Sequence, residues 1–226
     1  MSYRTSYHCT PTLEEVEKVA HAAVKALASA GIRSCLVGGM ACSIYGNSRV
    51  PSDVDIVCLT ETHAQEELKR ILVSNDSKFF TVRSKNPYAT YRVLWYRLSY
   101  IRDCKVDVLT PGTMNIPLVP TRRIAYKKDR SDLPLMPFLP LLLLKLQAWQ
   151  DHQNADKMYL REKQHVDVRD IDELLELAIE KYDVDFKRDG QWLLETFVNT
   201  AAARVRVYVR HFPTSAESWR SIGFRV

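Results

Sequence analysis

The sequence predicts an α/β (α+β) fold, with a small sheet and flanking helices followed by a helical C-terminal part. Two observations lead to this prediction. Short β-branched runs alternate with helical patterns as far as about residue 110, which is typical of helices packed on a sheet. After a proline-rich passage, only patterns with helical spacing remain. The chain has 226 residues, 46% of them hydrophobic, enough for a sizeable core in one domain or a compact pair.

The first predicted element is a helix that packs on the sheet. Thr12 and Glu15 form a capping-box pattern at its start, and Gly31 closes it. Its apolar face consists of Val16, Val19, Ala23, Val24 and Leu27. A strand at 35–37, a short helix at 40–45, a strand beginning at Asp53, a helix at 61–72 and strands near Phe79, Tyr91 and Val106 follow.

A glycine pair separates the strand at 35–37 from the short helix. Gly38 and Gly39 carry no side chains that would block close approach to the backbone. The first amides of the helix then face any anion that binds there. This arrangement favours a phosphate-binding turn.

Two carboxylates mark the next strand. Asp53 and Asp55 are two residues apart in a β-branched run, so both side chains point to the same face of the sheet. Unpaired acids on a half-buried strand are disfavoured. Carboxylate oxygens are the ligands that Mg²⁺ prefers, and the pair therefore predicts a divalent-cation site.

These residues carry a resemblance to a known family. The segment resembles the signature of the nucleotidyltransferase superfamily with a polymerase-beta-like fold, in detail its minimal and abortive-infection toxin branch. That pattern is met by Gly38, Gly39, Ala41, Gly46, Arg49, Asp53 and Asp55. Relatives commonly carry Thr and a basic residue where this chain has Pro51 and Ser52. The resemblance covers about residues 13–180 and implies a small mixed sheet.

The family also needs a third carboxylate on a neighbouring strand. Asp107 lies within an apolar strand pattern at 105–109 and is the predicted residue. Asp103 lies at the start of this strand and is expected to be a turn or edge residue.

Two further segments resemble the helices that follow in the family. The apolar run at 141–151 contains Lys145, and a later helix starts with Asp167. The resemblance implies that Lys145 contacts the triphosphate and that Asp167 is its partner or a supporting group. In the alternatives, Lys145 extends to water and Asp167 is a helix N-cap. The expected nucleotide-binding residues are Gly38, Gly39, Arg49, Ser52, Lys145 and Asp167.

The domain division follows from the prolines. We expect a catalytic domain at 1–112, a Pro-rich basic connection without regular structure at 113–136, and a helical domain at 137–226. The helices of this last part are predicted at 141–152, 168–182 and 191–203. The cleft between the two parts is the expected substrate site.

Cysteine usage and hydropathy indicate the compartment. Five cysteines without a Cys-x-x-Cys pair are expected to be reduced core residues, namely Cys9, Cys35, Cys42, Cys58 and Cys104. The histidines His152 and His165 lack the spacing of a zinc site, so no structural metal is expected. No apolar run is long enough to span a membrane. We therefore expect a cytoplasmic protein without membrane association.

The resemblance implies a Mg²⁺-dependent nucleotidyltransferase that moves a nucleoside monophosphate from an NTP to a hydroxyl acceptor and releases pyrophosphate. Asp53, Asp55 and Asp107 would hold two Mg²⁺ ions, and Asp107 would also accept the proton of the attacking hydroxyl. The acceptor is an RNA or tRNA end, a protein or a small molecule. RNA is a possible partner because basic patches occur near 122–130 and 204–225. The alternative is a catalytically silent nucleotide-binding or interaction module.

Overall fold

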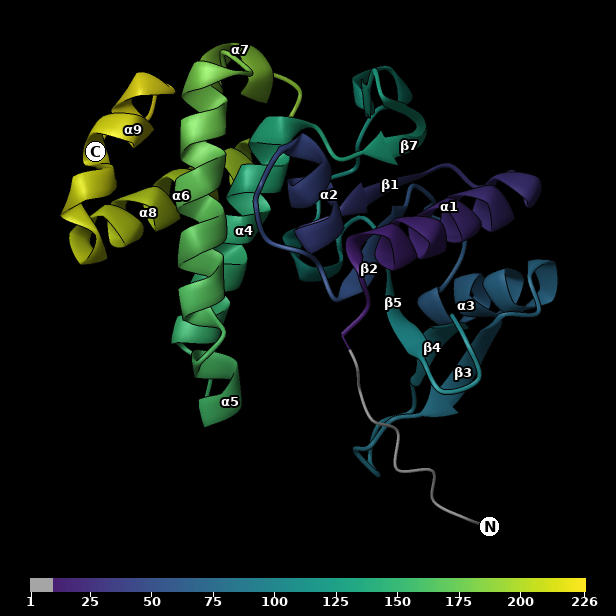
Figure 1. Ribbon diagram of the computed structural model, residues 1–226. Helices are drawn as coiled ribbons and strands as arrows, with labels where there is room; N and C mark the ends of the chain where they lie inside the picture. Colours follow the sequence, from purple (N-terminus) through teal and green to yellow (C-terminus); the bar gives the residue numbers. More distant parts are fainter. Residues whose placement is uncertain (1–9) are drawn as a thin grey trace.

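The computed structural model describes residues 10–226 and shows a mixed sheet with helices on its flanks and a helical C-terminal part (Figure 1). The strand order is β3-β4-β5-β2-β1-β7-β6. The pairs β2/β5 and β1/β7 are parallel, and the other neighbouring pairs are antiparallel. The strands are β1 Ser34–Val37, β2 Asp53–Cys58, β3 Phe79–Arg83, β4 Arg92–Arg97, β5 Asp103–Leu109, β6 Ala125–Lys127 and β7 Arg130–Leu135. The predicted α/β class is confirmed.

Three helices belong to the sheet region: α1 Leu13–Ser29, α2 Gly38–Tyr45 and α3 Gln65–Asn75. The expected capping box is present at the start of α1, where the Thr12 hydroxyl accepts from the Glu15 amide and the Glu15 carboxylate accepts from the Thr12 amide. Helix α3 begins four residues later than the sequence pattern suggested. Figure 1 shows α1 and α3 side by side over the sheet.

The C-terminal part is helical, as predicted. It consists of α4 Phe138–Gln153, α5 Met158–Arg161, α6 Gln164–Glu180, α7 Phe186–Gly190, α8 Glu195–His211 and α9 Ala216–Ser221. Helix α4 packs against both α6 and α8. The fully buried rings of Trp149, Tyr208 and Trp219 lie at the centre of this part. None of the helices in the described chain is long and apolar enough to cross a bilayer.

The proline-rich passage differs from its prediction. We expected residues 113–136 to lack regular structure, but β6 and β7 form a hairpin there and β7 joins the sheet beside β1. The prediction was wrong for this stretch because Leu133, Pro134 and Leu135 are buried, and burial in the core outweighs the weak strand tendency of proline. The passage also contains the short 3₁₀ turns η1 Thr113–Asn115 and η2 Thr121–Arg123.

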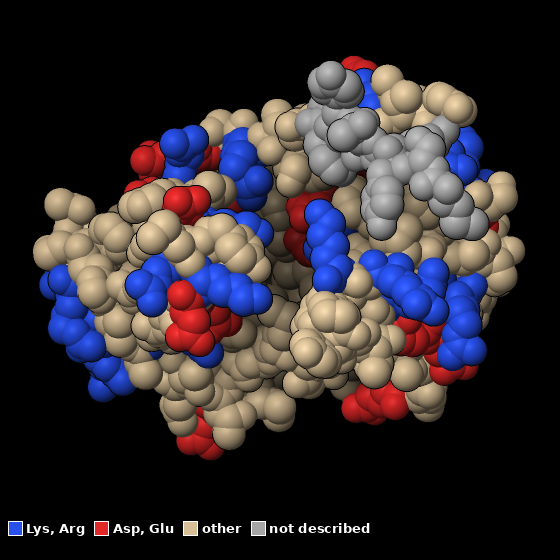
Figure 2. All heavy atoms as spheres, turned by 90° about the horizontal axis from the view of Figure 1, so that it is seen from below, with Lys and Arg blue, Asp and Glu red and all other residues tan. Residues whose placement is uncertain are grey.

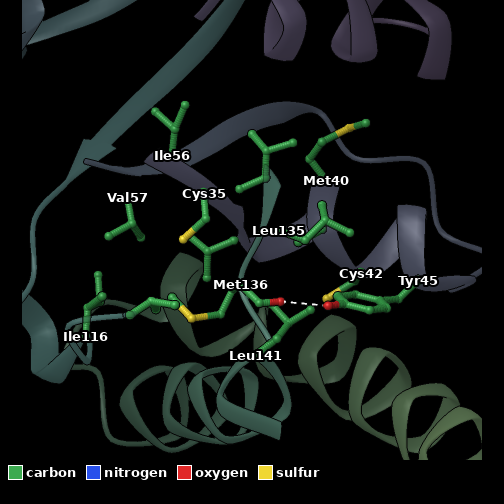
Figure 3. Close-up of a cluster of buried hydrophobic side chains, with 14 of the residues drawn as sticks. Cys35, Met40, Cys42, Tyr45, Ile56, Val57, Ile116, Leu135, Met136 and Leu141 are labelled. Atoms are coloured by element: carbon green, nitrogen blue, oxygen red, sulfur yellow. Dashed lines mark hydrogen bonds between the residues drawn. The ribbon is translucent and has the colours of Figure 1, made fainter. Parts of the chain in front are cut away.

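A continuous core joins the sheet to the first C-terminal helix (Figure 3). Cys35 and Ile56 from the sheet, Met40 from α2 and Leu141 of α4 belong to one cluster of buried side chains. The Tyr45 hydroxyl donates a hydrogen bond of 2.9 Å to the Met136 carbonyl. Helices α2 and α4, which carry the residues discussed below, are therefore fixed relative to each other.

The described cysteines are buried free thiols, as expected: Cys35, Cys42, Cys58 and Cys104. Burial raises the pKa of each of these thiols to about 12, so they stay protonated and unreactive at neutral pH. Cys9 lies outside the described residues.

Candidate active site

The turn from β1 into α2 brings two glycines to the edge of a cavity. Gly38 has a φ of +63°, and a Cβ atom at this position would overlap the Asp55 carboxylate. A Cβ atom at Gly39 would lie 2.9 Å from Nη2 of Arg49. Glycine at 38 is thus needed for both the backbone conformation and the close approach of a carboxylate. The first amides of the eight-residue helix α2 begin at this point.

Three carboxylates lie on one face of two neighbouring strands. Asp53 and Asp55 alternate with buried residues along β2. Asp107 is the register partner of Asp55 on the parallel strand β5. The pleat therefore points all three side chains to the same side of the sheet. All three line a cavity of about 530 Å³ together with Gly38 and Gly39.

The carboxylates repel one another in this cavity. Burial, and after it the charges of Asp53 and Asp107, raise the pKa of Asp55 to about 7. Lys105 offsets part of this charge, with its ammonium 2.5 Å from Oδ2 of Asp107. Burial opposes the charge of Lys105, but Asp107 and then Asp53 and Asp55 outweigh it and raise the pKa of this lysine. Negative charge is thus in excess at this end.

The donor chemistry of this end fits a hard divalent cation, because three carboxylates face one cavity and oxygen ligands suit Mg²⁺. Within residues 10–226, no three His, Cys, Asp or Glu side chains stand close enough together to hold an ion in the arrangement seen. Lys105 instead supplies the counter-charge at Asp107. A cation held by all three carboxylates would need their side chains to turn toward one point.

The opposite wall of the cavity carries a compact charge network. Arg49 donates two hydrogen bonds to Asp170, at 2.9 Å from Nε and 2.8 Å from Nη2. Lys145 lies 2.7 Å from the same carboxylate and 3.0 Å from Asp167. His152 Nδ1 lies 2.5 Å from the second oxygen of Asp167. Two carboxylates of α6 therefore join three segments of the chain: the loop after α2, α4 and α6.

This network holds its groups in their charged forms. Burial disfavours the Lys145 ammonium, but Asp167, followed by Cys42 and Asp170, overcomes this effect and raises the pKa of Lys145. Burial also opposes the Asp170 carboxylate, but hydrogen bonds from Arg49 and Lys145 hold its pKa below the ordinary value. Each cation is thus fixed in place before any ligand arrives.

The structure brings the residues singled out in the sequence to one cavity. Its walls include Gly38, Gly39, Arg49, Ser52, Asp53, Asp55, Asp107, Lys145 and Asp167. Lys145 meets carboxylates and does not extend to water. Asp167 is not a helix N-cap, because α6 begins after Lys163. Asp103 is the exposed first residue of β5, 3.9 Å from Arg97.

Sequence reasoning gave no role to two residues of this cavity region, Lys105 and Asp170. Lys105 stands two residues before Asp107 on the same strand face, so the alternation that identified Asp107 also placed Lys105 beside it. Asp170 stands three residues after Asp167, one helical turn away. Its role as partner of Arg49 and Lys145 depends on a contact between residues 121 apart in the chain, which no local pattern reveals.

A view of the molecule from below shows a hollow between two lobes, with acidic atoms inside it and Lys and Arg side chains at its borders (Figure 2). The sheet region provides one lobe and the C-terminal helices the other. The cavity lies between the two parts, since its lining residues come from both. That it is the substrate site stays a prediction.

Comparisons with known proteins give one informative result. No protein-family model and no curated protein sequence matches the chain. A solved structure does match: an antigenic nucleotidyltransferase-like protein from Paracoccidioides brasiliensis, with a TM-score of 0.64 and 17% sequence identity over 93% of this chain and 94% of that one. At this identity the similarity concerns the fold. The chain therefore has a nucleotidyltransferase-like fold, while the minimal or abortive-infection branch stays a prediction.

Proposed function

We propose that this protein is a Mg²⁺-dependent nucleotidyltransferase that transfers a nucleoside monophosphate from an NTP to a hydroxyl acceptor. One observation carries the proposal: a cavity with three clustered carboxylates on one wall and two fixed cations, Arg49 and Lys145, on the other. An NTP with its divalent cation has the complementary charges. The nucleotidyltransferase-like fold supports the same assignment.

Each group of cavity residues has its own role in the proposed reaction. Gly38 and Gly39 let the outer phosphates approach the start of α2, where backbone amides donate. Arg49 and Lys145 would donate to the triphosphate with the N–H groups that their bonds to Asp167 and Asp170 do not use. Bound Mg²⁺, held by Asp53, Asp55 and Asp107, supplies charge stabilisation for the attacking and leaving oxygens.

The proposed reaction needs no reactant besides the NTP and the hydroxyl acceptor. The acceptor oxygen forms a bond to the α-phosphorus, and the bond from that phosphorus to the bridging oxygen breaks. Pyrophosphate leaves, and Asp107 takes up the proton of the hydroxyl. Positioning and charge neutralisation therefore account for most of the rate increase.

The test follows a label from the α-phosphate. Each α-labelled NTP is incubated with Mg²⁺, the protein and cellular RNA and protein extract, and the products are separated by class. Label should move to RNA, to a protein or to a small molecule with wild type, and transfer should fall at least ~100-fold in Asp53→Asn. Asp103→Asn is the matched control, an exposed aspartate on β5 outside the cavity lining. Equal transfer by Asp53→Asn and wild type would contradict the proposal.

The ion pair between Lys105 and Asp107 favours a second candidate, a nucleotide-binding module without turnover. A lysine that permanently occupies Asp107 would stand in for the cation. In that case the protein binds NTP equally well with and without Mg²⁺, and no acceptor is labelled. Under the proposed function, NTP binding depends on Mg²⁺ because the carboxylates otherwise repel the triphosphate.

A further inference from the structure

The sheet face that carries the carboxylates continues outward over β5, β4 and β3. Register pairing places Asp53 beside Lys105, Lys105 beside Trp95, and Trp95 beside Phe80. Residues paired across neighbouring strands point to the same face. A straight row therefore runs from the catalytic carboxylates to two aromatic rings, with Trp95 about 10 Å from Asp53 by strand spacing.

The other face of these strands is already covered. Phe79, Leu94 and Tyr96 point to that side and are buried. Helix α3 packs there, with Leu68 and Leu72 in the core. Phe80 and Trp95 lie on the opposite side and are only partly buried. Aromatic side chains thus stand on an accessible face that adjoins the cavity.

Two cations share the face of these rings: Lys105 is the register partner of Trp95, and Arg97 follows Trp95 by two residues on β4. The Arg97 guanidinium lies over the Phe80 ring, 4.6 Å from its centroid, and is itself 54% exposed. Residues 78–107 contain seven Lys and Arg and two Asp. This stretch alone accounts for a charge of +5, equal to the formal net charge of the whole chain. Part of this charge lies away from the rings, because Arg92 bonds to Thr81 on the α3 side, Arg102 bonds to Glu15 of α1, and Lys78 lies over the Tyr96 ring. On the ring face, Arg97 and Lys105 are the cations available to a nucleic-acid backbone.

We propose that Phe80 and Trp95 form a stacking platform for the unpaired bases at the 3′ end of a single-stranded nucleic acid. Stacking on aromatic rings and attraction of the backbone to flanking Arg and Lys are the usual physics of single-strand binding. The placement of the terminal hydroxyl at Asp107 rests on the proposed function. About two strand spacings, ~10 Å, separate Trp95 from Asp53, and this is the distance that the chain between the stacked base and the terminal hydroxyl would span. The acceptor class of the enzyme is then a nucleic acid end.

Binding can be tested without transfer. A labelled single-stranded RNA of mixed sequence with a free 3′ hydroxyl is titrated with protein in the absence of NTP, and fluorescence anisotropy is measured. A DNA oligonucleotide of the same sequence is titrated in parallel. The comparison shows whether the protein prefers RNA or DNA. Affinity should decrease steeply with salt. Trp95→Ala should weaken binding at least ~10-fold, the loss of one stacked base.

Two further variants separate stacking from a loss of fold. Trp95→Phe keeps an aromatic ring and should retain most of the affinity. It should also remove most of the quenching of tryptophan fluorescence by the oligonucleotide, because Trp149 and Trp219 are fully buried and Trp192 lies in the C-terminal helical part, away from β3–β5. Tyr126→Ala is the matched control, since Tyr126 is 56% exposed on β6. Its affinity should equal that of wild type.

The outcomes separate this inference from the proposed function. Unchanged affinity in Trp95→Ala, or no binding of either oligonucleotide by wild type, would overturn the platform. If label nevertheless moves from an NTP to a protein or a small molecule, nucleotidyl transfer stands and only the acceptor class falls. If Trp95 is needed for binding but no label is transferred, the platform stands and the transferase proposal falls.

Discussion

The two walls of the cavity treat charge in opposite ways. On the sheet wall, Asp53, Asp55 and Asp107 share a single cation, Lys105. On the helical wall, Arg49 and Lys145 face two carboxylates, Asp167 and Asp170. On the sheet wall the carboxylates repel one another, and a bound divalent cation would reduce this repulsion. On the helical wall the positive and negative charges balance before any ligand binds. The contrast is the one that the proposed function requires, with a cation bound at the first wall and cations held in position at the second.

The largest effect on stability is expected from the balanced wall. Asp170→Asn removes the negative charge that holds Arg49 and Lys145 while it keeps the side-chain shape. Because the Asp170 side chain is 1% exposed, loss of its charge should reduce the free energy of unfolding by about 2–3 kcal/mol. Tm should fall by roughly 5–10 °C. Glu176→Gln on the exposed side of α6 is the control, and an equal Tm in both variants would contradict the comparison.

A smaller effect is expected when Lys145 is changed. Lys145→Ala should weaken NTP binding about 10-fold by titration calorimetry in the presence of Mg²⁺, because one fixed positive charge facing the triphosphate is lost. Lys145→Arg should restore part of the affinity. Lys25→Ala on the exposed side of α1 should leave it unchanged. If Lys145→Ala retains wild-type affinity, this lysine has a structural role only.

Gly38, at the cavity, and Gly112, after β5, allow a matched comparison of the cost of adding a Cβ atom. Gly38 and Gly112 both have a positive φ, of +63° and +82°, but a Cβ atom overlaps the Asp55 carboxylate only at Gly38 and meets nothing within 4 Å at Gly112. Gly112→Ala should cost about 1 kcal/mol of backbone strain. Gly38→Ala should cost more and also reduce transfer. Equal urea-unfolding free energies for the two variants would show that Asp55 does not need this space.

The two walls also predict opposite pH dependence of stability in metal-free buffer. The pKa of Asp55 is raised from 3.8 to about 7 in the folded protein, so its contribution is complete below about pH 4 and is lost as the pH rises through 7. The pKa of Asp170 is lowered below 3.8, so its contribution is present above about pH 4 and is lost on further acidification. Asp55→Asn should remove the first dependence and Asp170→Asn the second. Unfolding curves between pH 3 and 8 that are unchanged in both variants would contradict these assignments.

Local sequence patterns predicted the sheet wall and much of the fold. The period-two alternation of β2 and β5 placed Asp53, Asp55 and Asp107 on one face, and apolar periodicity located α1 and α4. The helical wall was only partly predictable, because the bonds of Asp170 to Arg49 and Lys145 join distant segments. The β6–β7 hairpin was missed because burial of Leu133 and Leu135 overrides the prolines around them.

Under the proposed function, the sheet wall requires a divalent cation to accept a nucleotide. The most direct test measures the Tm of wild type and Asp55→Asn with NTP alone, with Mg²⁺ alone and with both. Mg²⁺ and NTP together should raise the Tm of wild type and leave that of Asp55→Asn unchanged. Without metal, Asp55→Asn should be at least as stable as wild type, because burial, and after it the charges of Asp53 and Asp107, disfavour the carboxylate that the variant lacks. An equal rise in both proteins would show that nucleotide binding does not use these carboxylates.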